Sequence, residues 1–242
     1  MGCFKLPSGL CQHIVSMTNR FYWGSKKGER KIHWIKWDKM CLPKQCGGLE
    51  FRDIEAFNMA LLAKQGWRLI RNPDSLVAKT IGCKYFNRKS FLSSKIGFTP
   101  SYTWRSIWQA KGVLERGGCW KVGNGNNIKI WKDPWLPKQN GSKVWSPPKI
   151  LEADATIAEL MTTDDKEWNR RLINQIFLNF EVKQIIKIPI PRSDQPDRFI
   201  WKKARDGNFR VKLAYHEIKI QNRNQPYNSS IDQEEENTWK QL

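Results

Sequence analysis

The sequence has no long apolar run, few histidines and no closely paired cysteines. No stretch of the 242 residues approaches the roughly 18 apolar residues that a membrane-spanning helix needs, so no membrane partner is expected. The six cysteines stand singly at irregular spacings, without a signal peptide, which argues against a disulfide framework and favours reduced thiols. An intracellular, reducing compartment is therefore expected, and the nucleus, the cytosol and the mitochondrion all meet that condition.

Side chains for catalysis or metal binding are also scarce. With three histidines, no His-Glu-x-x-His pattern and no Ser or Cys beside a credible base, no hydrolytic site is expected. Cys41 and Cys46 lack the second close pair that structural zinc sites use. Asp164 and Asp165 follow two threonines, a setting typical of a helix start rather than of a polymerase carboxylate pair. We therefore expect no catalytic residue, no metal ligand and no cofactor.

Positive charge is abundant and unevenly distributed. The chain has 42 Lys and Arg against 23 Asp and Glu, a formal net charge of +19. Residues 1–140 hold 25 of these bases and 8 of the acids, so nearly all of the excess lies there. A folded protein with such a surplus repels itself unless it meets a polyanion, and RNA or DNA is the expected partner.

The periodicity of apolar residues predicts a mainly α protein with small β-hairpins, of the α+β class. Asp53 is an N-cap candidate for a helix over residues 54–71, and Thr99 with Pro100 has the pattern of another helix start. Prolines at 134, 137, 147 and 148 mark a linker between two modest helical modules. The predicted divisions are a basic module over 1–132, a Pro-rich linker over 133–150, a second module over 151–220 and a polar tail over 221–242.

The stretch "GCWKVGNGNNIKIWKDPWLP", residues 118–137, contains a glycine loop that has two interpretations. A phosphate-binding loop needs a further glycine and a following helix, but Ile128 occupies that position and strand-like residues follow. Asn124 and Gly125 instead form a favoured turn pair between two alternating segments. The sequence thus predicts a hairpin here, and a second hairpin followed by a helix over residues 197–218, with its turn at Asp206-Gly207.

Two groups of residues are candidates for contacting nucleic acid. Lysines and arginines interleave with tryptophans before Met40, a pattern in which cations neutralise phosphates and indole faces stack on bases. A second group consists of three basic residues that lie four and three positions apart within residues 64–71, a spacing that places them on one face of a helix. The alternative interpretation is that the tryptophans are core residues and the cations a solvated rim. The candidate residues are Lys26, Lys27, Arg30, Lys31, Trp34, Lys36, Trp37, Lys39, Lys64, Arg68 and Arg71.

Two long stretches, "FYWGSKKGERKIHWIKWDKMCLPKQCGGLEFRDIEAFNMALLAKQGWRLI" and "SYTWRSIWQAKGVLERGGCWKVGNGNNIKIWKDPWLP", resemble a known family. They are similar to the region downstream of the catalytic core in plant non-LTR (LINE-type) retrotransposon reverse transcriptases. Residues 197–218 similarly resemble the start of the zinc-binding domain of that family. The resemblance implies a thumb-and-connector region that holds template and primer, followed by a truncated zinc-binding-like module.

The resemblance also implies what this chain is expected to lack. The aromatic-x-Asp-Asp motif of these RNA-directed DNA polymerases lies upstream of the similar region, and the Cys/His cluster lies beyond Leu242. The sequence therefore predicts a nucleic-acid-binding fragment of a retroelement polyprotein that is not an enzyme on its own. Two alternatives stay open: a degenerate remnant without selected activity, and a part of a polymerase that is active only with an upstream catalytic core.

Overall fold

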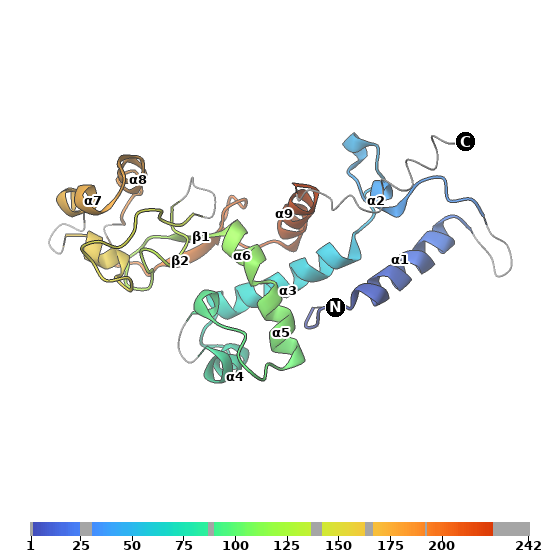
Figure 1. Cartoon of the computed structure of the whole chain (residues 1–242), viewed down its shortest axis with the longest axis horizontal. Coiled ribbons are helices and arrows are strands. Elements are labelled where there is room, and N and C mark those ends of the chain that lie inside the picture. Colours follow the sequence, from blue (N-terminus) through green and yellow to red (C-terminus); the bar gives the residue numbers. More distant parts are fainter. Residues whose placement is uncertain are drawn as a thin grey trace.

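The computed structural model describes residues 2–24, 31–86, 90–136, 142–162, 167–191 and 193–224. It is mainly helical with one small antiparallel sheet, which confirms the predicted fold class (Figure 1). Short 3-10 helices lie at Lys44–Cys46, Phe91–Ser93 and Ile157–Leu160. The helices are α1 (Ser8–Tyr22), α2 (Trp37–Met40), α3 (Ile54–Arg71), α4 (Leu76–Tyr85), α5 (Tyr102–Gln109), α6 (Lys111–Gly117), α7 (Arg170–Ile176), α8 (Asn179–Ile185) and α9 (Val211–Asn224), and the strands are β1 (Gly118–Lys121) and β2 (Arg198–Trp201).

Side-chain caps set the starts of the central helices. Asp53 accepts a 3.0 Å hydrogen bond from the Ala56 amide, as predicted for the start of α3. The helix expected to begin at Thr99 begins instead at Tyr102, because the Ser101 hydroxyl accepts from the Trp104 amide at 3.3 Å. Both arrangements satisfy amides that have no partner in the first turn of a helix.

The sheet joins segments that are distant in the sequence. β1 pairs with β2 in an antiparallel register that places Gly118 opposite Trp201 and Lys121 opposite Arg198. The predicted hairpin within residues 118–130 is therefore wrong, since Lys129 forms an isolated bridge with Thr156 instead. In residues 197–218, a turn does follow β2, but the described chain there continues into α9 without a second strand.

Buried apolar residues of the described chain form two cores. The first combines buried residues of α3 to α6 with β2 and α9, and Trp67 lies near its centre, 5.5 Å from Phe199 and 6.4 Å from Trp201 between ring centroids. The second combines residues 122–136 with residues 155–185, and Trp120 packs against both cores. The proposed domain divisions stay a prediction, and the cores are built from segments that alternate along the chain.

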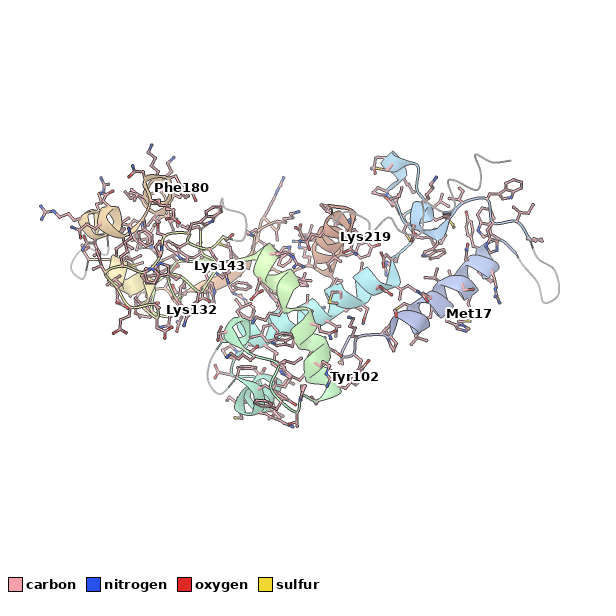
Figure 2. All side chains as sticks on the ribbon, viewed as in Figure 1. Met17, Tyr102, Lys132, Lys143, Phe180 and Lys219 are labelled. Carbon is pink, nitrogen blue, oxygen red and sulfur yellow. The ribbon has the colours of Figure 1, made fainter. Side chains whose placement is uncertain are left out.

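Helix α1 exposes apolar side chains at its surface. Cys11 is its one buried residue, whereas Met17 and Phe21 are exposed, and Met17 is visible on the outer side of α1 in Figure 2. In the part of the chain that the structure describes, no helix combines the length and apolar character required to cross a membrane. All six cysteines are free, and Cys11, Cys41 and Cys119 are buried.

Candidate nucleic-acid interface

The glycine loop of residues 123–127 wraps around a carboxylate of the protein itself. The amides of Gly123 and Gly125 donate to Oδ1 of Asp197 at 2.8 and 2.9 Å, and the Asn127 amide donates to Oδ2 at 2.9 Å. Successive backbone amides that converge in this way form an anion-binding concavity. Asp197 occupies the position that a phosphate would need, so the loop is a structural clasp between β1 and β2.

The basic segment before α2 is only partly described. Lys26, Lys27 and Arg30 lie outside the described residues, and nothing in the structure places them. The remaining predicted cations of this segment, Lys31, Lys36 and Lys39, are all exposed.

The two tryptophans of this segment differ in what they can offer a ligand. Trp34 is 76% exposed, so the core interpretation is wrong for this residue, and an exposed indole can stack on a base. Trp37 is half-buried and packs against Phe51 at 5.2 Å between centroids. Trp37 therefore acts in packing, and Trp34 is the candidate for stacking.

The predicted basic ridge on α3 is present and extends onto the sheet. Lys64 and Arg68 are exposed, while Arg71 is half-buried at the last position of the helix. Burial is the main cause that lowers the pKa of Arg71, and the positive charge of Arg198 is the second cause. Arg198 lies directly opposite Lys121 across the β1–β2 pair, an arrangement in which like charges repel. Below, "the α3 ridge" means Lys64, Arg68 and Arg71 together with Lys121 and Arg198.

Sequence reasoning missed Arg198 and Lys121 as members of this group. Each stands in a segment whose strand character was recognised, but nothing local in the sequence indicates that the two strands pair with each other. Only the register of β1 against β2 places Lys121 opposite Arg198, whose charge acts on Arg71 at the C-terminal end of α3.

The two candidate groups do not form one compact patch. The segment of α2 packs near the N-terminal end of α3, where Trp37, Asp53 and Ile54 line a common cavity. Arg71 is the last residue of the same helix, and 18 residues at 1.5 Å each give a length of about 27 Å. Any ligand that contacts both groups must therefore be extended along α3.

The cations of both groups are not neutralised within the part of the chain that the structure describes. The described ion pairs involve other bases: Lys111 with Glu115, Lys132 with Asp154, Lys203 with Glu217, Arg210 with Asp206, and Lys219 with Asp53. None of the six described candidate cations pairs with a described carboxylate.

The residues considered for metal binding are dispersed over the described chain. Cys41 is buried and Cys46 is exposed, and no group of three or more His, Cys, Asp or Glu side chains among the described residues has the geometry of a metal site. Asp164 and Asp165 lie outside the described residues.

Comparison with known proteins places the chain among plant relatives. It is 41% identical over 137 residues to the uncharacterized mitochondrial protein AtMg00310 of Arabidopsis thaliana, an alignment that covers 56% of this chain and 89% of that protein. The chain belongs to the same family as that mitochondrial protein. No protein-family model matches the chain, and no solved structure matches it significantly.

A second relative is much longer than this chain. The putative ribonuclease H protein At1g65750 of Arabidopsis thaliana is 26% identical over 228 residues, which is 91% of this chain but 36% of that protein. The chain thus spans about a third of the length of this relative. The expected kinship with the C-terminal region of reverse transcriptases stays a prediction.

Proposed function

We propose that this chain is a nucleic-acid-binding segment derived from a retroelement polyprotein and that it has no reaction centre of its own. The observation that carries the proposal is the α3 ridge, a row of cations without carboxylate partners among the described residues. When cations on a folded surface neutralise phosphates, the counterions condensed around the nucleic acid are released, and this release drives binding.

The dimensions of α3 suit a polymer better than a small anion. A helix of about 27 Å spans about eight phosphates of one nucleic-acid strand at 3.4 Å per step. The α3 ridge would hold the strand near the sheet, and Lys31, Lys36 and Lys39 would contact it beyond the other end of α3. Trp34 would add a stacking surface for an unpaired base.

The name of the longer relative, a putative ribonuclease H protein, supports RNA as the class of ligand. The alignment with that protein covers 91% of this chain. The relative is longer than the aligned region, so any nuclease activity need not involve the residues that are shared with this chain.

Salt-dependent binding to a labelled oligonucleotide tests the proposal. We expect the affinity of the full chain for a single-stranded RNA of about 20 nucleotides to fall steeply between about 50 and 200 mM salt. The double variant Lys64→Gln/Arg68→Gln should weaken binding and lower the slope of log affinity against log salt by about 1 to 2. Binding that does not change with salt would refute the electrostatic mechanism.

A control variant separates local contacts from net charge. Lys149→Gln/Lys183→Gln removes the same charge from exposed positions beside the second core. This variant should leave the affinity within about twofold of the original, because screening at physiological salt limits the influence of distant charges to about 8 Å. An equal loss in both double variants would show that the ridge has no special role.

A second candidate function is supported by the length of the longer relative. The alignment covers 91% of this chain and 36% of that protein, as expected for one segment of a larger RNA-directed DNA polymerase that acts only with an upstream catalytic core. An antibody raised against this chain tests this on plant extracts. Detection of a product well above 28.5 kDa would support the larger protein, and a product of that mass alone would oppose it.

A further inference from the structure

A groove of about 610 Å³ lies between the N-terminal segment and four helices. Its walls come from residues 5–8, from the first half of α3, from α5 and α6, and from the C-terminal half of α9. The volume falls within the range of about 300 to 1,000 Å³ that is usual for ligand sites in proteins. None of the residues named as candidates from the sequence lines this groove.

The floor of the groove is apolar and its shape is fixed. Met59, Val113 and Ile218 contribute apolar surface from α3, α6 and α9. The buried Asn58 side chain accepts from the Leu6 amide and donates to the Phe4 carbonyl, both at 2.9 Å, and so ties the N-terminal segment to α3. A floor of this kind offers apolar side chains to the ring of a base.

The rim of the groove is basic. Lys5, Arg105 and Arg116 are exposed, and Glu55 is the single carboxylate among the described residues that line the groove. Neither guanidinium pairs with a carboxylate in the described chain. Guanidinium groups bind phosphate oxygens through two parallel hydrogen bonds, so these arginines are suited to a phosphate chain.

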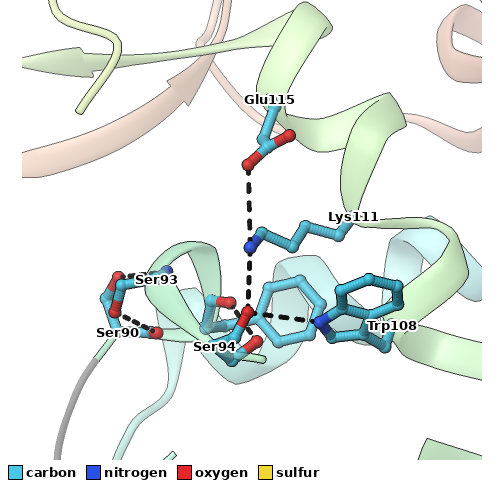
Figure 3. Close-up of polar contacts among 7 residues, drawn as sticks. Ser90, Ser93, Ser94, Trp108, Lys111 and Glu115 are labelled. Atoms are coloured by element: carbon cyan, nitrogen blue, oxygen red, sulfur yellow. Dashed lines mark hydrogen bonds and ion pairs between the residues drawn. The ribbon is translucent and has the colours of Figure 1, made fainter. Parts of the chain in front are cut away.

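The elements that carry the rim are held in place by polar contacts. The Ser94 carbonyl accepts from Trp108 Nε1 at 3.2 Å and from Lys111 Nζ at 3.0 Å, which fastens the junction of α5 and α6 to the preceding turn (Figure 3). Tyr102, at the start of α5 in Figure 2, donates through its hydroxyl to the Lys5 carbonyl at 2.6 Å. Both arginines therefore project from a fixed frame.

We propose that this groove holds a single-stranded stretch of the bound nucleic acid, with a base and its sugar on the apolar floor and the flanking phosphates on Arg105 and Arg116. The inference rests on the proposed function and assigns a specific site to it. A single strand is favoured over a duplex because only unpaired bases can turn a ring face toward an apolar floor.

Charge removal at the rim tests the phosphate contacts. In the full chain, Arg105→Gln/Arg116→Gln should weaken binding of a labelled oligouridine of about 12 nucleotides by about tenfold or more and lower the salt slope by about 1 to 2. Lys149→Gln/Lys183→Gln, with the same change in charge, should stay within about twofold. Both arginines are exposed, so the melting temperature should not change.

A neutral variant tests occupation of the groove itself. Gln109 is an exposed lining residue, and Gln109→Trp would fill the groove without changing the charge. We expect weaker binding of oligouridine, and an unchanged affinity would overturn the proposal. An oligouridine containing 4-thiouridine should crosslink to peptides of α5 or α6, whereas crosslinks confined to other segments would overturn it.

The outcomes distinguish the groove from the general function. If the original chain binds, the Lys64/Arg68 variant weakens binding and the Arg105/Arg116 variant matches its control, the groove proposal fails and the α3 ridge stands. Equal loss of single-stranded and duplex binding in the Arg105/Arg116 variant would also refute the groove. If an acidic peptide of about 12 residues displaces oligouridine at equal concentration, the groove recognises charge alone and the assignment to nucleic acid is wrong. Absence of any salt-dependent binding would remove both proposals.

Discussion

The amide of Gly125 donates a 2.9 Å hydrogen bond to Oδ1 of Asp197, the residue immediately before β2. The amide of Gly123 shares the same oxygen, and the Asn127 amide reaches the other. Gly123 lies just after the end of β1, and Asp197 lies just before the start of β2. The hydrogen bonds between them therefore hold the end of β1 against the start of β2, where Lys121 lies opposite Arg198. The glycine loop therefore organises the sheet between the two cores and leaves ligand binding to other surfaces.

Removal of this carboxylate should destabilise the fold. Asp197→Ala leaves three amides without their acceptor, and we expect a loss of about 2 to 4 kcal/mol in the free energy of unfolding, measured by urea denaturation. Asp197→Asn, which keeps one acceptor oxygen, should lose less. Glu152→Ala, at an exposed position, is the control and should change stability little. Equal stability of the Ala variant and the original would contradict the clasp.

Glycine is required at position 125 for two separate reasons. Its φ is +75°, and a Cβ there would lie 2.6 Å from the Ala158 amide nitrogen. Gly97 has a φ of +81° but no atom within 4 Å of an added Cβ, so it isolates the conformational cost. Gly97→Ala should cost about 1 to 2 kcal/mol, and Gly125→Ala about 2 kcal/mol more. Equal melting temperatures for the two variants would show that Ala158 moves aside freely.

Asp133 should give the folded state a distinct dependence on pH. Burial raises the pKa of this carboxyl, while hydrogen bonding from the Lys129 amide opposes the rise. A carboxyl with a raised pKa in the folded state binds more protons folded than unfolded between its two pKa values, so its destabilising contribution is present at neutral pH and disappears as the pH falls. The contribution of Asp133 to stability changes over the pH range between the raised pKa of the folded state and the unfolded pKa of about 3.9.

The measurement is the difference in unfolding free energy between the original chain and Asp133→Asn. This difference should shift in favour of the original chain as the pH falls from about 7 toward 4. Glu152→Gln, at an exposed site, controls for the loss of one negative charge and should show no such trend. A constant difference for Asp133→Asn would mean that burial does not perturb this carboxyl.

Trp34 and Trp145 form a matched pair for testing base stacking. Their side chains are 76% and 69% exposed, so replacement of either by alanine should change the free energy of unfolding little. Trp34→Ala should weaken binding of single-stranded RNA about fivefold or more, since stacking contributes about 1 to 3 kcal/mol per base. Trp145→Ala should have a much smaller effect, because Trp145 lies outside both basic groups. Similar effects in anisotropy titrations would argue against a role for Trp34.

Features governed by near neighbours in the chain were predictable. Asp53 and the helix-forming residues after it predict α3, and the spacing of Lys64, Arg68 and Arg71 places them on one face. The missing phosphate-loop glycine led instead to a predicted hairpin turn at residues 123–127, which is wrong, because the chain there bends around the carboxylate of Asp197. The predicted start of α5 was two residues too early, because Thr99 and Ser101 lie close together and offer competing caps, and in the structure Ser101 caps the helix.

Features governed by distant neighbours were not predictable. Residues around the glycine loop have hairpin periodicity, yet β1 pairs with β2, and the carboxylate of Asp197 takes the place of a second local strand. Apolar residues such as Met17 and Phe21 recur along α1, yet both are exposed, Phe21 to 87%. In each case the sequence indicates an apolar surface or a strand, but it does not indicate which segment packs against that surface or pairs with that strand.

The sequence by itself determined the start of α3 and the surplus of positive charge, because a helix cap acts over a few residues and composition does not depend on the fold. The tertiary structure decided that Arg198 and Lys121 join the α3 ridge and that Arg105 and Arg116 share the rim of one groove. These groupings arise from strand pairing and helix packing between segments far apart in the chain, where contact energies depend on the whole fold and leave no local pattern.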